Sequence, residues 1–231
     1  NEGYVEEILE RKTVLKRPSV ANITQALIVF SIKNPNPNLW LLDRFLVLAE
    51  GAGVNIAIII NKIDLSDNNL FKEIFIILTS TKTSCGIDEL KNTLKDNVTV
   101  FAGPSGVGKS SLLNRVQPNL QLNVGEISGK TKRGKHTTRH VELLELDLGG
   151  YVLDTPGFSS LDLDFINREE DLKYYFKEIL EYGAQCKFSS CLHVGEPGCH
   201  VIEGVESGEI GKTRYDNYIS FLDEIKSNRR Y

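Results

Sequence analysis

A glycine-rich segment in the middle of the chain has the spacing of a phosphate-binding loop. It fits the pattern GxxxxGK[ST] without a mismatch and consists of Gly103, Pro104, Ser105, Gly106, Val107, Gly108, Lys109 and Ser110. Glycines let the backbone wrap around phosphates, so that successive N–H groups and a helix N-terminus face the negative charge. We expect Lys109 to reach the β- and γ-phosphates, Ser110 to ligate Mg²⁺ and Ser111 to line the same site. The alternative is a glycine-rich turn from strand to helix.

Two upstream motifs indicate which nucleotide this loop binds. Asp64, in the sequence NKID after the run NIAIII, can accept hydrogen bonds from the ring N–H and the exocyclic amine of guanine, a pair that adenine lacks. Asn61 would support the base and its loop, and the stem of Lys62 would pack over the ring. A second motif resembles the SAK-type loop of GTPases and consists of Ser80, Thr81 and Lys82. Either motif alone is weak, since NKID also suits a solvated strand end.

A DxxG element lies downstream of the phosphate loop. We expect Asp154 to hold Mg²⁺ through water and the Gly157 N–H to meet the γ-phosphate. Many GTPases place a glutamine directly after this element to orient the attacking water, and here that position is Phe158. We therefore expect slow intrinsic turnover, with water positioned by another group, for which His136 is the candidate.

Positive charge is concentrated in residues 130–139, between the phosphate loop and the DxxG element. The basic side chains are Lys130, Lys132, Arg133, Lys135 and Arg139. They can contact RNA phosphates, in which case binding should weaken steeply with salt. The alternative is a solvated, mobile loop. This is also where a first switch belongs, so Thr137 or Thr138 should contact Mg²⁺ and the γ-phosphate.

Three thiols and an imidazole lie within 14 residues near the C-terminus, at Cys186, Cys191, His193 and Cys199. A closed Cys₃His set is typical of structural zinc, and thiolate ligands argue against Mg²⁺ or Ca²⁺. His200 is a possible substitute for His193, and a few buried cysteines without metal are the alternative reading. No ligand position is left for a catalytic water.

Alternating strand and helix patterns surround these motifs. Apolar runs predict strands at 26–31, 55–60, 75–80, 97–102, 141–147 and 151–154. Helical spacing predicts helices at 41–49, at 86–95 and from Lys109. The bulk of the chain is thus an α/β domain with a mainly parallel sheet. After Phe158 the sequence becomes acidic and predicts a helix over about 168–182 and a last helix with Tyr215, Tyr218, Ile219, Leu222 and Ile225 on one face.

The order of the motifs is unusual. GTPases ordinarily run from the phosphate loop through the switch threonine and DxxG to NKxD and SAK. Here NKID and STK come first, followed by the phosphate loop and then DTPG. This order predicts a circular permutation, in which the same sheet is rebuilt because the positions of the loops in space matter, and not their order in the chain.

Composition limits the possible functions. Apolar residues make up 41% and charged residues 25%, and the net charge is −4, so any contact with nucleic acid must be local. No apolar run approaches the ~18 residues of a membrane span, and four cysteines are too few for a disulfide framework. The expected compartment is the cytoplasm. The sequence contains no methionine, from which we expect it to be incomplete.

Taken together, NKID, STK, GPSGVGKSSLLN, GKHTTRHVEL, DTPGFSSL and CKFSSCLHVGEPGC resemble the ribosome small subunit-dependent GTPase A (RsgA/YjeQ) family over nearly the whole chain. The resemblance implies a permuted GTPase that binds the 30S subunit and acts late in its maturation, with Mg²⁺ and GTP or GDP. Its HTT pattern points to Thr138, and its metal pattern selects His193.

The resemblance also implies a domain order. We expect the end of an N-terminal OB-fold at 1–17, the permuted GTPase domain at 18–163 and a helical zinc-binding domain at 164–231, in a monomer without membrane contact. Two alternatives stay open. One is a permuted GTPase of large-subunit assembly, and the other is a nucleotide-gated RNA-binding adaptor with little hydrolysis.

Overall fold

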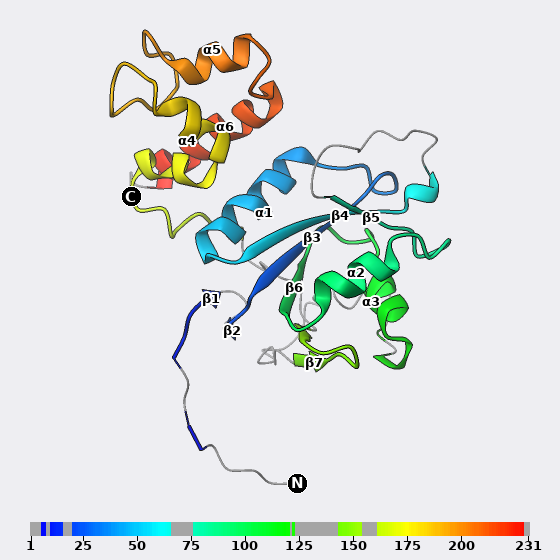
Figure 1. Cartoon of the computed structure of the whole chain (residues 1–231). Coiled ribbons are helices and arrows are strands. Elements are labelled where there is room, and N and C mark those ends of the chain that lie inside the picture. The colour runs from blue at the N-terminus through cyan, green and yellow to red at the C-terminus, as the bar shows by residue number, and fades with distance from the viewer. Residues whose placement is uncertain are drawn as a thin grey trace, which may run out of the picture. The chain divides into compact units, whose positions relative to one another are not determined.

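The computed structural model describes residues 6–7, 10–15, 20–65, 76–120, 122, 143–153 and 161–228 (Figure 1). The chain divides into two compact units, one drawn from Asn1–Pro35 and Ala52–Ser159 and the other from Asn36–Gly51 and Ser160–Tyr231. Residues 36–51 thus group with the C-terminal unit, although they lie inside the predicted GTPase domain. The predicted domain boundaries stay predictions. Within the described ranges, no helix is both long and apolar enough to cross a membrane.

The described strands of the first unit form a six-stranded sheet in the order β5-β4-β3-β6-β8-β7. Neighbouring strands are parallel except β7, which is antiparallel to β8. The strands are β3 (Gln25–Ser31), β4 (Asn55–Asn61), β5 (Ile76–Leu78), β6 (Val98–Ala102), β7 (Leu143–Glu145) and β8 (Tyr151–Leu153). A separate antiparallel pair joins β1 (Val14–Leu15) to β2 (Val20–Ala21). The predicted mainly parallel α/β sheet is confirmed.

Strand β3 lies between β4 and β6, and all of its residues are buried. Its apolar run suits a parallel strand, which is buried on both faces and carries little polar alternation. The described helices of this unit are η1 (Ile63–Leu65), α2 (Ile87–Leu94), α3 (Lys109–Val116) and η2 (Pro118–Leu120). One apolar cluster joins α2 and α3 to the sheet through Leu27, Val29, Ile59, Ile77, Leu90, Leu94, Phe101, Leu112 and Leu113.

The parallel strands place four loops at one edge of the sheet. Because β3, β4, β5 and β6 run in the same direction, their carboxyl ends share that edge, where ligands of open α/β sheets bind. The loops begin at Ile32, Lys62, Thr79 and Gly103. Motifs that are far apart in the sequence are thereby brought to one side of the unit.

The second unit is helical. It contains α1 (Leu39–Ala52), η4 (Glu169–Tyr175), α4 (Lys177–Gly183), α5 (His200–Glu206) and α6 (Lys212–Asn228). The single helix predicted over about 168–182 is wrong, because Phe176 adopts an extended conformation (φ −127°, ψ 93°) between η4 and α4. Its ring is fully buried and lies edge-on to Tyr218, with centroids 5.3 Å apart. The backbone leaves the helical path where this ring enters the core.

Charged side chains hold α1 to the rest of the second unit. Asp43 accepts hydrogen bonds from Arg214 and Asn217, each at 2.6 Å, and Arg214 also binds Glu178 at 2.5 Å. Burial raises the pKa of Asp43, while Arg214 and the Asn217 amide act in the opposite direction. Arg44, which is 3% exposed, makes a bidentate pair with Glu224 on α6 at 2.6 and 2.5 Å. Asp43 and Arg44 therefore each face a group of opposite charge, which offsets the cost of removing them from water.

Candidate nucleotide site and metal centre

The predicted phosphate loop connects β6 to α3, and its backbone requires glycine at two points. Gly103 has φ 138°, and a Cβ there would lie 2.1 Å from the Val29 carbonyl oxygen. Gly108 has φ 101°, and a Cβ there would lie 2.4 Å from Nδ2 of Asn61. Both positions have positive φ and no room for a side chain, so the loop can pass close to β3 and to the end of β4.

Lys109 begins α3 and folds back into the loop. The residue is 2% exposed, and its Nζ donates to the carbonyls of Gly103 at 2.7 Å and Pro104 at 2.8 Å. Burial lowers the pKa of Lys109 to about 8. An anion in the loop would offer this ammonium group a stronger partner than two neutral carbonyls. Ser110, in the same helical turn, is 4% exposed.

Asn61 joins the ends of two strands to the phosphate loop. The side chain is fully buried, its Nδ2 donates to the Val107 carbonyl at 2.8 Å, and its Oδ1 accepts from the Thr79 hydroxyl at 3.1 Å. The structure therefore brings NKID, the end of β5 and the phosphate loop together, as the predicted circular permutation requires.

Lys62 and Asp64 lie at the same edge. Lys62 has φ 61°, and its Nζ donates to the Gly106 carbonyl at 2.8 Å and to the Asn34 carbonyl. The Asp64 carboxylate accepts from the Ser80 hydroxyl at 2.5 Å, and Ser80 in turn accepts from the Thr83 N–H at 3.2 Å. The motifs NKID and STK, which are predicted to bind guanine, are thus in direct contact in the structure.

Three residues of this arrangement were not predicted. They are Asn34, whose carbonyl holds Lys62; Thr79, which orients Asn61; and Arg115, whose Nε donates to the Thr81 carbonyl at 2.9 Å. The sequence KNPNPN, which follows β3, indicates a turn at Asn34 and could have drawn attention to this residue. The other two carry no signal, because their partners are distant in sequence.

Several predicted site residues lie outside the described residues. They are Lys130, Lys132, Arg133, Lys135, His136, Thr137, Thr138, Arg139, Asp154, Gly157 and Phe158. Their roles in switching, RNA contact and water positioning stay predictions.

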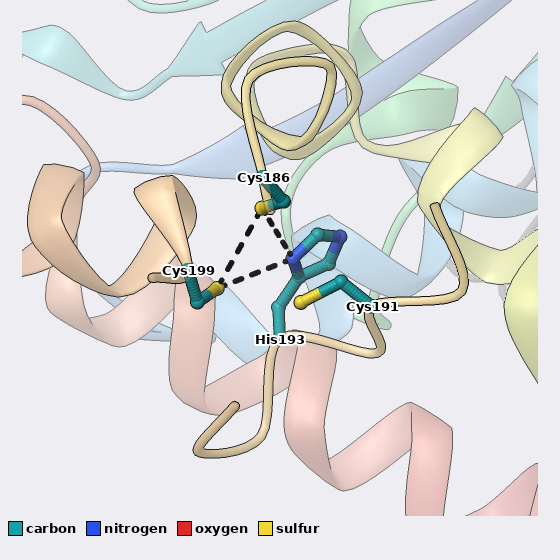
Figure 2. A group of neighbouring side chains, drawn as sticks. All are labelled: Cys186, Cys191, His193 and Cys199. Atoms are coloured by element: carbon teal, nitrogen blue, oxygen red, sulfur yellow. Dashed lines mark hydrogen bonds between the residues drawn. The ribbon is translucent and has the colours of Figure 1, made fainter. Parts of the chain in front are cut away.

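The predicted metal ligands converge between α4 and α5 (Figure 2). Nδ1 of His193 lies 3.6 Å from Sγ of Cys186 and 3.4 Å from Sγ of Cys199, and these two sulfurs are 3.9 Å apart. The four ligand atoms, with Cys191 included, all lie within 4.8 Å of one another. A tetrahedral zinc site has sulfur–sulfur edges of about 3.8 Å and sulfur–nitrogen edges of about 3.6 Å. The donor set and the spacing both fit zinc.

Burial suits these side chains to a metal. His193 is 1% exposed, and Cys191 and Cys199 are 3% exposed. Burial lowers the pKa of His193, which keeps the imidazole neutral, and raises the pKa of Cys191 to about 12. Burial also raises the pKa of Cys199, so without a cation the Cys191 and Cys199 thiols stay protonated, and a metal that binds them must displace these protons. Nε2 of His193 is a buried atom without a hydrogen-bond partner among the described residues.

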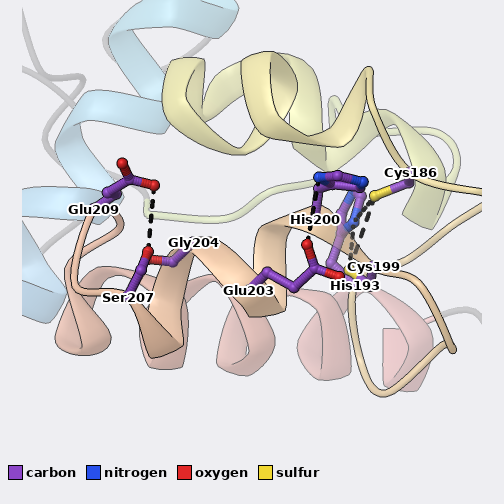
Figure 3. A network of polar contacts seen from close by, with 8 residues as sticks. All are labelled: Cys186, His193, Cys199, His200, Glu203, Gly204, Ser207 and Glu209. Carbon is purple, nitrogen blue, oxygen red and sulfur yellow. Dashed lines mark hydrogen bonds and ion pairs between the residues drawn. The ribbon is translucent and has the colours of Figure 1, made fainter.

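His200 does not belong to the cluster (Figure 3). Its Nδ1 faces Oε2 of Glu203 at 3.4 Å on α5, whereas His193 faces the sulfurs. The loop that carries His193 is fixed by Glu196, whose carboxylate accepts from the N–H groups of Leu192 and Val194, each at 2.8 Å. Burial acts to raise the pKa of Glu196, but these backbone N–H groups and their neighbours outweigh it and lower the pKa to about 2.

The chain matches one family along most of its length. A family model described as RsgA GTPase matches residues 8–164. The small ribosomal subunit biogenesis GTPase RsgA of Alkaliphilus metalliredigens is 47% identical, with 99% of this chain and 81% of the relative covered. The protein of the same description from Geobacillus thermodenitrificans is 51% identical, with 99% and 81% covered.

Two solved structures agree with this match. The crystal structure of YjeQ from Thermotoga maritima is 42% identical with a TM-score of 0.81, and the match covers 95% of this chain and 77% of that one. The crystal structure of YloQ, a circularly permuted GTPase, is 41% identical with a TM-score of 0.79, and the match covers 99% and 77%. The predicted resemblance and the permuted order are confirmed: the chain belongs to the RsgA GTPase family.

Proposed function

We propose that this protein hydrolyses GTP and that it acts in the biogenesis of the small ribosomal subunit. One observation supports the nucleotide chemistry most strongly. Asn61 joins the phosphate loop to the loops of NKID and STK, so the parts that would bind the phosphates and the base are built as one structure. The names of the relatives favour small-subunit biogenesis over the large-subunit alternative.

The phosphates would lie in the loop formed by Gly103 to Gly108, with Lys109 and Ser111 beside them. Lys109 would exchange its two loop carbonyls for phosphate oxygens and remain charged, because the anion offsets the cost of burial. The Ser110 hydroxyl lies in the first turn of α3, where an oxygen ligand for Mg²⁺ is needed. Together with Thr138 and Asp154 it would hold this ion, which supplies positive charge near the transferred phosphoryl group.

The base would be selected at the other end of the site. The Asp64 carboxylate, already oriented by the Ser80 hydroxyl, would accept the two N–H donors of guanine. Lys62 would lie over the ring, and the backbone of Ser80, Thr81 and Lys82 would meet the guanine carbonyl. Thr81 is held from α3 by Arg115, which ties this loop to the helix of the phosphate loop.

Hydrolysis would be slow until a partner binds. The side chain of Phe158 cannot orient a water molecule by hydrogen bonding, and His136 is our candidate for that role. The basic residues at 130–139 would contact ribosomal RNA phosphates, which confines the RNA contact to a short part of an acidic chain. We propose a monomer in the cytoplasm that binds the 30S subunit.

The Cys₃His cluster would hold one structural zinc ion. Cys186, Cys191, His193 and Cys199 supply four ligands, which fill a tetrahedral site and leave no open position for chemistry. The zinc would fix the segment between α4 and α5. The backbone hydrogen bonds of this segment are mainly short-range bonds within turns, such as the one from the Cys191 N–H to the Phe188 carbonyl at 3.2 Å.

GTP turnover with purified ribosomal subunits tests the proposal. We expect low turnover for the protein alone, strong stimulation by 30S subunits and none by 50S subunits. Stimulation by 50S subunits, or by neither, would contradict the proposal. Lys109→Ala protein in the same assay serves as the control for contaminating GTPases.

A further inference from the structure

Ser31 is a buried hydroxyl that the proposed function does not use. It ends β3 at the edge of the sheet where the nucleotide loops begin, and it is fully buried. Its Oγ donates to the Pro35 carbonyl at 2.8 Å. The hydroxyl thus closes the turn 31–35 directly after the central strand.

This turn packs against both predicted halves of the nucleotide site. The Ile32 N–H donates to the Asn61 carbonyl at 3.0 Å, which joins the turn to the start of NKID. A Cβ added to Gly106 would lie 3.8 Å from Cδ of Pro35, so the turn lies beside the phosphate loop. The turn therefore lies beside the phosphate loop and is hydrogen-bonded to the base motif.

Lys62 is held between the turn and the phosphate loop. Its ammonium group donates to the Asn34 carbonyl in the turn and to the Gly106 carbonyl in the loop. A free lysine side chain has many rotamers and loses conformational entropy when it is fixed. Two carbonyl partners of one ammonium group restrict its stem before any ligand arrives, and such preorganisation improves affinity.

We propose that Ser31 is a positioning residue for guanine nucleotide binding. Through its hydrogen bond to Pro35 it holds the turn 31–35 so that the Asn34 carbonyl anchors Lys62, whose stem then lies ready for the base. The proposal rests on the role assigned above to Lys62. Ser31 itself touches neither nucleotide nor metal.

A double-mutant cycle on the full chain tests this proposal. GDP binding is measured by calorimetry for the wild type, Ser31→Ala, Lys62→Ala and the double variant. We expect Ser31→Ala to weaken GDP binding about 3- to 10-fold, the effect of one lost hydrogen bond. In the Lys62→Ala background the same change should alter the affinity by less than about twofold, because Ser31 acts through Lys62.

A matched control separates positioning from stability. Thr99 is fully buried in β6, and its hydroxyl accepts from Gln25 at 2.7 Å. Thr99→Val removes a buried hydroxyl from the same sheet and should lower the melting temperature while it leaves GDP affinity unchanged. If Ser31→Ala does not fold, Ser31→Cys replaces it in the cycle, because it keeps the size and offers only a weak donor.

Three results would overturn the proposal. Unchanged GDP affinity in Ser31→Ala would show that the turn does not position Lys62. Equal losses from Ser31→Ala with and without Lys62 would show a merely structural role, and they would leave the proposed function intact. Unchanged affinity in Lys62→Ala would contradict the proposed role of Lys62 and the inference with it.

Discussion

The two candidate sites of this protein are built in opposite ways. The nucleotide site draws on four loops between Ser31 and Ser110, and most of its interactions involve backbone carbonyls or glycine conformations. The metal centre draws on 14 consecutive residues and on four side chains that converge on one point. The first arrangement depends on the sheet that carries the loops. The second depends on a ligand that the side chains surround.

This difference predicts which segments of the chain lose their conformation when the metal is removed. The sheet has its own apolar cluster, so the nucleotide loops should keep their conformation without zinc. The segment 184–199 contains no described helix or strand, so it should lose its conformation without the metal. The rest of the second unit is also held by buried side chains and by the ion pairs of Asp43 and Arg44, which do not involve the metal ligands. We therefore expect loss of the metal to affect mainly the segment 184–199.

Loss of the metal should have the largest effect. Structural zinc contributes about 10–16 kcal/mol in zinc-finger peptides, so Cys199→Ser or a strong chelator should abolish hydrogen-exchange protection over residues 184–199. Protection of β3 and β6 should not change. Cys85→Ser is the matched control, because Cys85 is exposed and outside the cluster. Retained protection in Cys199→Ser would contradict the assignment of a structural metal.

Lys109→Ala should have the next largest effect. Removal of the one lysine in the phosphate loop should lower GTP turnover by at least about 100-fold, as loss of a preorganised charge does in other active sites. Turnover is measured with 30S subunits present, and zinc content is measured on the same sample. Lys91→Ala, on the exposed side of α2, is the control. Loss of zinc together with turnover would contradict the separation of the two sites.

Asp64→Asn should remove the preference for guanine. We expect GDP affinity to fall about 10- to 100-fold, since two hydrogen bonds to a charged acceptor are lost or weakened. Inosine diphosphate lacks the exocyclic amine, so its affinity should fall less, and the ratio of the two affinities is the readout. Asp88→Asn changes an exposed carboxylate on α2 and should leave the ratio unchanged. An unchanged ratio in Asp64→Asn would show that the base is selected elsewhere.

The smallest expected effect is a pH dependence of GDP binding. The pKa of Lys109 is lowered to about 8 by burial, and bound phosphate should raise it again. Below pH 8 the lysine is charged before GDP binds. Above pH 8, binding must take up a proton, so affinity should fall by up to about tenfold per pH unit. Calorimetry in buffers of different ionisation enthalpy measures this uptake.

Lys109→Arg provides the control for that titration. Arginine does not deprotonate in this range, so the variant should show only the pH dependence that belongs to the nucleotide itself. Equal pH profiles for the wild type and the Lys109→Arg variant would contradict the lowered pKa.

The two sites also differ in how far the sequence could predict them. The metal centre was predicted with its alternative, His200, because all ligands are local in the chain; the structure then separates His193 from His200 by geometry. The parallel sheet and the edge that carries the loops were predictable from the apolar runs. Asn34, Thr79 and Arg115 were not, because their partners lie 18 to 34 residues away.

Long-range contacts explain the remaining differences in the fold. The helix over 41–49 was predicted from its apolar spacing alone, which gives no sign of the ion pairs of Asp43 and Arg44, because their partners Arg214 and Glu224 follow 171 and 180 residues later. The break at Phe176 has the same origin, since the ring packs against Tyr218 on α6. Local periodicity cannot predict an interruption that tertiary packing imposes.

Native mass spectrometry of the intact chain tests the central claim most directly, that one chain holds a structural zinc and a separate guanine nucleotide site. The protein is mixed with equal concentrations of GDP and ADP in the presence of Mg²⁺. We predict a complex with one zinc ion and one GDP, and with Cys199→Ser a complex that keeps GDP and lacks zinc. A wild-type protein without zinc, or one that binds ADP as readily as GDP, would contradict the account.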